Sequence, residues 1–174
     1  GRMNALPPEA IPEAVFDEAS ALVISSYLLR CAPDDPMPAA TRRAIALAKA
    51  RDVPVILTLG TRFVIAERPD FWREFITENV DILAMNEEEA EALTGEANPI
   101  LACTRALDFA DLILCTAGAT GLYLAGFTDD AVKRETRYPL LPGAIPEFNR
   151  YEFSRPMRRN RCEKPIKVYA HISP

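Results

Sequence analysis

The stretch that decides the fold is Asp111-Leu112-Ile113-Leu114-Cys115-Thr116-Ala117-Gly118-Ala119-Thr120-Gly121-Leu122-Tyr123-Leu124-Ala125-Gly126. Its first part, 111–116, is an apolar run too short for a helix and predicts a buried strand. The small residues of 116–121 follow as a tight loop, and a second apolar run occupies 122–125. Because glycines let a phosphate group approach the backbone closely, the loop is a candidate phosphate site.

A second predicted strand, Asp81-Ile82-Leu83-Ala84-Met85, ends in Asn86-Glu87-Glu88-Glu89. Acidic groups in this position can meet a hydrated metal ion. Phosphate on one loop and a metal ion on the next would indicate an enzyme that uses a nucleotide.

The rest of the chain alternates strands with helices of about ten residues, which is typical of an α/β fold with right-handed crossovers and a parallel sheet. Further strands are expected at 21–25, 53–59 and 166–172, and helices at 11–19, 38–51, 69–79, 86–94 and 99–109. Gly60, Asn86 and Thr116 each follow a strand directly, so they should share the edge of the sheet where ligands collect. A helix-like piece at 129–137 and a basic stretch at 150–167 complete the chain.

Composition limits the function classes. The chain has 174 residues and a formal charge of −5, which opposes general binding of nucleic acid. Its apolar stretches are too short to span a membrane. The four cysteines, which have no metal-type spacing, are expected to be reduced thiols of a cytosolic protein: Cys31, Cys103, Cys115 and Cys162.

Each motif also has a plain structural interpretation. Asn86 with Glu89 three residues on resembles a capping box, and residues 116–121 are equally suited to the turn of a hairpin. The basic stretch, with Arg155, Arg158 and Arg159 as phosphate-binding candidates, is more often a solvated surface. The sole histidine, His171, is expected to be structural, because no partner makes it part of a nucleophile.

Taken together, these residues resemble the ribokinase-like family of sugar and nucleoside kinases. Asn86-Glu87-Glu88-Glu89 is similar to its N-x-x-E motif, and Thr116-Ala117-Gly118-Ala119-Thr120-Gly121 to its T-x-G-x-x-G nucleotide loop. The blocks 55–67, 138–145 and 151–155 resemble the members of the family that act on inosine and guanosine. The resemblance implies a mostly parallel sheet flanked by helices in three layers, incomplete in this chain.

The resemblance also implies phosphorylation of the 5′-hydroxyl of inosine or guanosine, with ATP and Mg²⁺ as cofactors. Asn86, Glu89, Thr116, Gly118 and Gly121 would bind the nucleotide, and Glu89 would reach the metal ion through water. The expected partner is a small nucleoside, with no nucleic acid and no membrane, and a homo-oligomer is left open.

Two departures from the family pattern matter. The family's D-P-N-x-R motif is reduced to Arg62, and its G-A-G-D motif, which carries the general base, is absent from the chain. We therefore expect residues 1–174 to be part of a kinase domain, with the substrate lid before Gly1, the catalytic aspartate beyond Pro174 and no turnover by themselves. A sugar kinase of the same family and a non-catalytic nucleotide-binding module are the alternatives.

Overall fold

The computed structural model describes residues 5–30, 35–127 and 166–171; for residues 120, 127 and 166–171 it describes the backbone only. The candidate helix at 129–137, the arginines of the basic stretch, Cys31 and Cys162 lie outside these residues. Within the described part of the chain, no helix is long and apolar enough to cross a bilayer.

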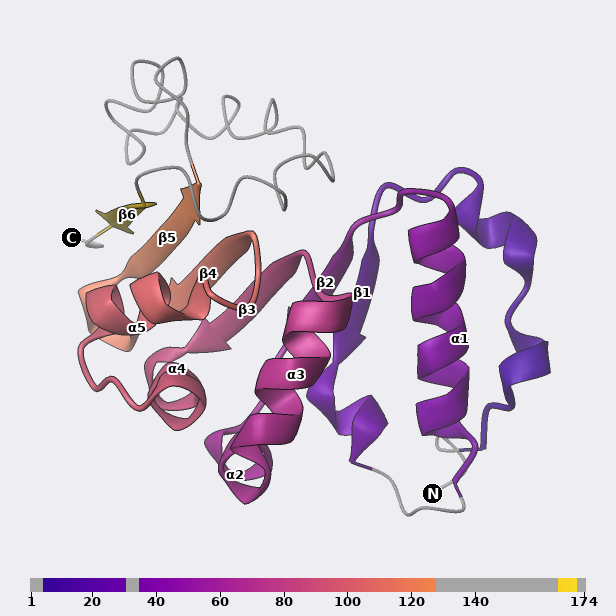
Figure 1. The fold of residues 1–174 in the computed structure, drawn as a ribbon, viewed down its shortest axis with the longest axis horizontal. Helices are drawn as coiled ribbons and strands as arrows, with labels where there is room; N and C mark the ends of the chain where they lie inside the picture. Colours follow the sequence, from indigo (N-terminus) through magenta and orange to yellow (C-terminus); the bar gives the residue numbers. More distant parts are fainter. Residues whose placement is uncertain (1–4, 31–34, 128–165, 172–174) are drawn as a thin grey trace.

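A six-stranded sheet, ordered as in the sequence, forms the centre of the molecule (Figure 1). Its strands are β1 (Leu22–Ser25), β2 (Val55–Thr58), β3 (Ile82–Asn86), β4 (Leu112–Thr116), β5 (Leu122–Phe127) and β6 (Ile166–His171). Neighbours from β1 to β4 are parallel, whereas β5 and β6 are antiparallel to the strands that precede them. The predicted mostly parallel α/β sheet is confirmed.

Five α-helices connect or follow these strands: α1 (Met37–Ala50), α2 (Arg62–Glu67), α3 (Pro69–Asn79), α4 (Glu87–Thr94) and α5 (Pro99–Ala106). Four of them match predicted helices. The hexapeptide α2 was not predicted, because six residues between Gly60 and Pro69 are too few to show a helical period.

The predicted helix over 11–19 is wrong. The structure has two short 3-10 helices in this region, η2 (Pro8–Ala10) and η3 (Glu13–Phe16). Pro12 has an extended backbone and stands between them, so a continuous α-helix cannot form. A third 3-10 helix, η4 (Ser26–Leu29), begins the connection that was predicted as a loop, and α5 ends three residues earlier than expected.

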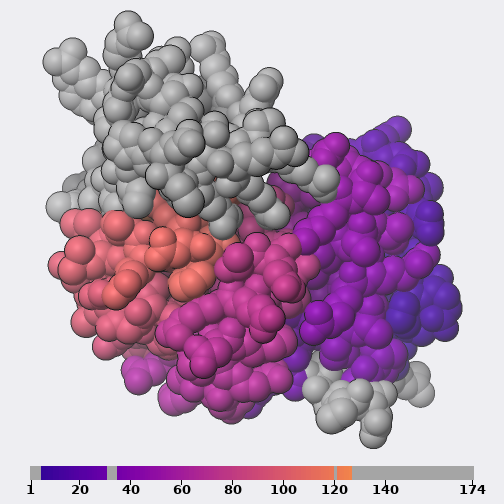
Figure 2. Space-filling model, viewed as in Figure 1, coloured from indigo at the N-terminus to yellow at the C-terminus, as the bar shows by residue number. Residues whose placement is uncertain are grey.

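The core lies on one face of the sheet, where strand residues in matching register meet the five helices. Leu57, Leu83 and Ile113 are fully buried and adjacent across β2, β3 and β4. Trp72 of α3 packs against them with no exposed surface and donates a hydrogen bond to the Val64 carbonyl (2.9 Å). The space-filling view from the same side shows side chains of these helices closing over much of the face (Figure 2).

The opposite face is less covered by the described residues. Val23, which points away from the core on β1, is 65% exposed. The three-layer prediction requires helices on this side as well, and none of the helices within 5–30 and 35–127 contributes to it.

Candidate functional site: two loops at the carboxyl edge of the sheet

The carboxyl ends of β3 and β4 lie side by side. Asn86, the last residue of β3, is directly opposite Thr116, the last residue of β4. On the other side of β3, the Leu59 N–H donates to the Ala84 carbonyl (3.1 Å), which brings Gly60 to the same edge. The predicted common location of Gly60, Asn86 and Thr116 is therefore confirmed.

A capping box connects β3 to α4. The Asn86 side-chain oxygen accepts a hydrogen bond from the Glu89 N–H (2.8 Å). In return, the Glu89 carboxylate accepts from the Asn86 N–H (2.9 Å) and from the Asn86 side-chain nitrogen (3.2 Å). The structural interpretation of this motif is confirmed, and its geometry fixes where α4 begins.

Burial gives the Glu89 carboxyl group unusual electrostatics. The residue is only 4% exposed. Burial raises the pKa of Glu89 above its ordinary value, the hydrogen bond from the Asn86 N–H opposes that change, and the negative charges of Glu88 and Glu87 add to it. With both of its oxygens bonded to Asn86, Glu89 faces the protein as much as it faces the edge.

The loop between β4 and β5 is the turn of a hairpin, since Thr116 and Leu122 are paired across the two strands. The Ala117 N–H donates to the Gly121 carbonyl (2.8 Å), and the Gly121 N–H donates to the Gly118 carbonyl (3.2 Å), closing a compact turn around the 3-10 helix η5 (Gly118–Thr120). Gly121 has φ 107° and ψ −145°, a conformation that only glycine adopts readily.

The two loops meet at Glu87 and Gly118. A Cβ atom built on Gly118 would lie 3.9 Å from Glu87 Oε1, and no other atom that counts as a neighbour would come within 4 Å of it. The hairpin loop is therefore open around Gly118, with a carboxylate of α4 at its border. Sequence reasoning placed both loops at this edge but did not assign Glu87 a role.

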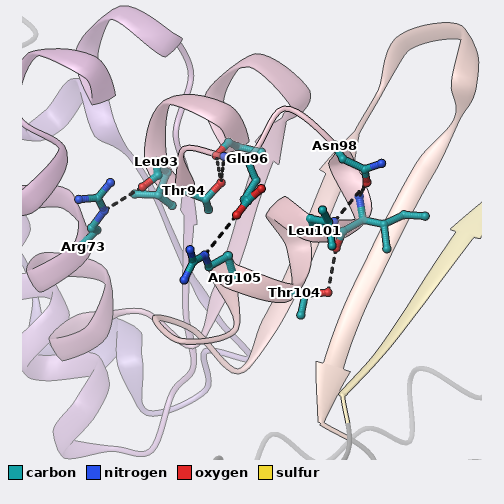
Figure 3. A network of polar contacts seen from close by, with 10 residues as sticks. Arg73, Leu93, Thr94, Glu96, Asn98, Leu101, Thr104 and Arg105 are labelled. Carbon is teal, nitrogen blue, oxygen red and sulfur yellow. Dashed lines mark hydrogen bonds and ion pairs between the residues drawn. The ribbon is translucent and has the colours of Figure 1, made fainter.

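The far end of α4 is held by polar contacts with α3 and α5 (Figure 3). Arg73 of α3 donates to the Leu93 carbonyl (2.9 Å). Glu96, just after α4, forms an ion pair with Arg105 of α5 (3.5 Å), and Asn98 caps α5 by accepting from the Ile100 N–H (2.9 Å). With both of its ends fixed, α4 presents its first turn to the hairpin loop in a defined position.

The β1–β2 side of the edge carries aromatic groups that the sequence analysis missed. Ser26 donates a hydrogen bond to the Leu59 carbonyl, and the Tyr27 hydroxyl donates to the Gly60 carbonyl (3.4 Å), so η4 is tied onto the end of β2. Tyr27 is 49% exposed, and Phe63 at the start of α2 is 69% exposed, with the Arg62 guanidinium 5.7 Å from its ring centre.

The cysteines of the described region support the predicted reduced state. Cys103 of α5 and Cys115 of β4 are free, buried thiols. The Cys103 thiol donates to the Cys115 sulfur, which lowers the pKa of Cys115, while burial and the negative charges of Glu87 and Glu89 act in the opposite direction. No group of three or more His, Cys, Asp or Glu side chains that could hold a metal ion occurs among the residues that the structure describes.

The fold and the two loops at its edge define a class. The chain has the fold of the ribokinase-like sugar and nucleoside kinases, although no family model matches its sequence. Adenosine kinase from Sinorhizobium meliloti superposes with a TM-score of 0.61 at 24% identity, covering 68% of this chain and 36% of that protein. A candidate ribokinase II from E. coli, in complex with ATP and Mg²⁺, gives a TM-score of 0.57 at 19% identity over 68% of this chain and 39% of that one.

Within this class, the chain is similar to guanosine-inosine kinase of Escherichia coli (strain K12). The two are 62% identical over all 174 residues of the chain, which spans 40% of the length of that relative. The same identity and coverage hold for guanosine-inosine kinase of two further E. coli strains.

Proposed function

We propose that this chain supplies the ATP-binding side of a kinase that transfers a phosphoryl group from ATP to the 5′-hydroxyl of inosine or guanosine. The observation that carries the proposal is the 62% identity to guanosine-inosine kinase over the whole chain, since a sequence this similar adopts the same loops and contacts. The juxtaposition of the Asn86 and Gly118 loops at one edge supports it, because parallel α/β sheets bind ligands there.

The hairpin loop is proposed to lie along the ATP. Thr116 is exposed at the end of β4, and Gly118 leaves open space beside the backbone. Gly121 holds the loop in a shape that another residue would strain. A backbone without Cβ atoms lets phosphate oxygens come close to the chain, which is what the nucleotide loop of a kinase must permit.

The first turn of α4 fits the magnesium ion that accompanies ATP. Its donors are carboxylate and amide oxygens, which Mg²⁺ prefers, and Mg²⁺ is usually held by one or two carboxylates together with substrate phosphates and water rather than by a complete protein cage. In phosphoryl transfer the metal ion neutralises negative charge on the transferred group. We propose that Asn86 fixes the position of Glu89, and that Glu89, whose oxygens already accept hydrogen bonds, reaches the ion through water.

No residue of this chain is assigned as the catalytic base. The base is expected to be an aspartate of a G-A-G-D motif beyond Pro174, where it would take the proton from the attacking hydroxyl. The pairing of His171 with Leu122 is consistent with this expectation, because it returns the backbone of β6 to the edge at which Thr116 lies. The arrangement assigns positioning to this chain and proton transfer to a residue outside it.

The proposal is tested by replacing the matching segment of E. coli guanosine-inosine kinase with residues 1–174. The hybrid enzyme is then incubated with labelled MgATP and inosine, guanosine, adenosine or fructose. We expect transfer to inosine and guanosine above the other acceptors. A hybrid with Gly121→Val, which strains the nucleotide loop, is the matched control and should lose ATP binding.

A folded hybrid that binds MgATP but phosphorylates neither inosine nor guanosine would refute the nucleoside assignment, and transfer to fructose alone would favour the sugar kinase alternative. The 174-residue chain by itself is expected to bind MgATP without turnover. A cytosolic location accompanies the proposal, in keeping with the free thiols of Cys103 and Cys115.

A further inference from the structure

The three glutamates that open α4 have different surroundings, although they are adjacent in the sequence. Consecutive helical residues point about 100° apart, so the three side chains leave the helix in different directions. Glu89 is buried in the capping box, Glu88 is exposed, and Glu87 is half-buried beside the hairpin loop.

Glu87 has no hydrogen-bond or ion-pair partner among residues 5–30 and 35–127. The ion pairs of this region lie elsewhere, and none of them involves the first turn of α4. The carboxylate is the one group that borders the open space at Gly118, where a phosphate is proposed to lie. A bare negative charge next to a triphosphate is repulsive, so this placement favours binding only when a cation lies between the two groups.

We propose that Glu87 is a second carboxylate of the magnesium–nucleotide site, which approaches the metal-bound triphosphate from α4 across Gly118. The inference rests on the proposed function, and it adds a residue whose unpartnered position only the tertiary structure shows. In this arrangement Glu89 holds the first turn of α4 in place, and Glu87 makes ATP binding depend on the metal ion.

The alternative role for Glu87 is structural, as a negative charge at the positive end of the α4 dipole. Glu88 occupies the next position of the same helix turn, and it carries the same charge while pointing away into solvent. A dipole role therefore predicts that Glu87→Gln and Glu88→Gln behave alike. A role at the metal ion predicts that they differ.

The experiment measures the dissociation constant of ATP by calorimetry, with excess Mg²⁺ and with EDTA, for the 174-residue chain and both variants. In Glu87→Gln, the metal-free ATP should bind more tightly and MgATP more weakly than in the parent chain. We expect the ratio of the two constants to fall about tenfold, equivalent to about 1.4 kcal/mol. Glu88→Gln should change the ratio by less than about twofold, since its charge is exposed and screened.

Two further measurements separate the outcomes. Mn²⁺ replaces Mg²⁺ in an electron paramagnetic resonance titration, and Glu87→Gln should retain less bound Mn²⁺ in the presence of ATP than Glu88→Gln does. Glu87→Asp keeps the charge and should keep the metal dependence. Equal ratios in the two glutamine variants would overturn the role of Glu87 while leaving the proposed function intact, whereas a parent chain that binds no MgATP would remove both.

Discussion

Replacing Asn86 by alanine tests whether the capping box holds the candidate site together. The change removes the acceptor of the Glu89 N–H and the side-chain donor to the Glu89 carboxylate, which is then buried with one hydrogen bond fewer. Loss of an N-cap costs about 1 kcal/mol, and loss of a hydrogen bond to a charged, partly buried group adds about 1 kcal/mol or more. We therefore expect Asn86→Ala to lower the free energy of unfolding by about 2 kcal/mol.

Asn98 provides the matched control, because it also caps a helix. It accepts hydrogen bonds from the Ile100 and Leu101 N–H groups, but these bonds are exposed and it supports no buried carboxylate. Asn98→Ala should cost only the cap itself, about 1 kcal/mol. The two variants thus share the cap and differ in the second hydrogen bond.

Urea denaturation followed by circular dichroism measures both effects. With a denaturant slope of about 2 kcal/mol per molar urea, the midpoint should fall by about 1 M in Asn86→Ala and about 0.5 M in Asn98→Ala, with the slope unchanged. If Asn98→Ala shifts the midpoint as much as Asn86→Ala does, the hydrogen bonds to the Glu89 carboxylate contribute nothing to stability, and the reasoning is refuted.

Three further predictions concern stability. Gly60→Ala should lower the urea midpoint more than Gly95→Ala does, because both glycines have positive φ but an added Cβ at Gly60 would lie 2.7 Å from the Tyr27 ring while Gly95 is open; Tyr27→Ala should restore part of the loss at Gly60, and equal losses would contradict the clash. Trp72→Ala removes a fully buried side chain and should cost about 3–5 kcal/mol, measured by the same unfolding assay. Because the pKa of Glu89 is raised in the folded state, its contribution to stability is fully present below its ordinary value of 4.5 and is lost as the pH rises through the folded-state value. The stability difference between the parent chain and Glu89→Gln should therefore be larger near pH 4.5 than near pH 8, and a difference independent of pH would contradict the raised pKa.

The sequence by itself determined the order of the elements and the edge at which the loops meet. Short apolar runs identify β3 and β4 because a buried strand has no alternative way to shield such residues from water, and their parallel direction follows from the helices between them. The capping box was readable in the sequence because its hydrogen bonds join residues three positions apart.

The tertiary structure decided the features that depend on contacts between distant residues. Six residues of α2 carry too weak a pattern to be recognised, and Pro12 divided a segment whose composition favoured a helix. Above all, the sequence presents Glu87, Glu88 and Glu89 as equivalent charges at the start of a helix. Only the packing of α4 against the hairpin loop buries the last, exposes the second and brings the first to Gly118, because the direction of each side chain is set by where the helix is anchored.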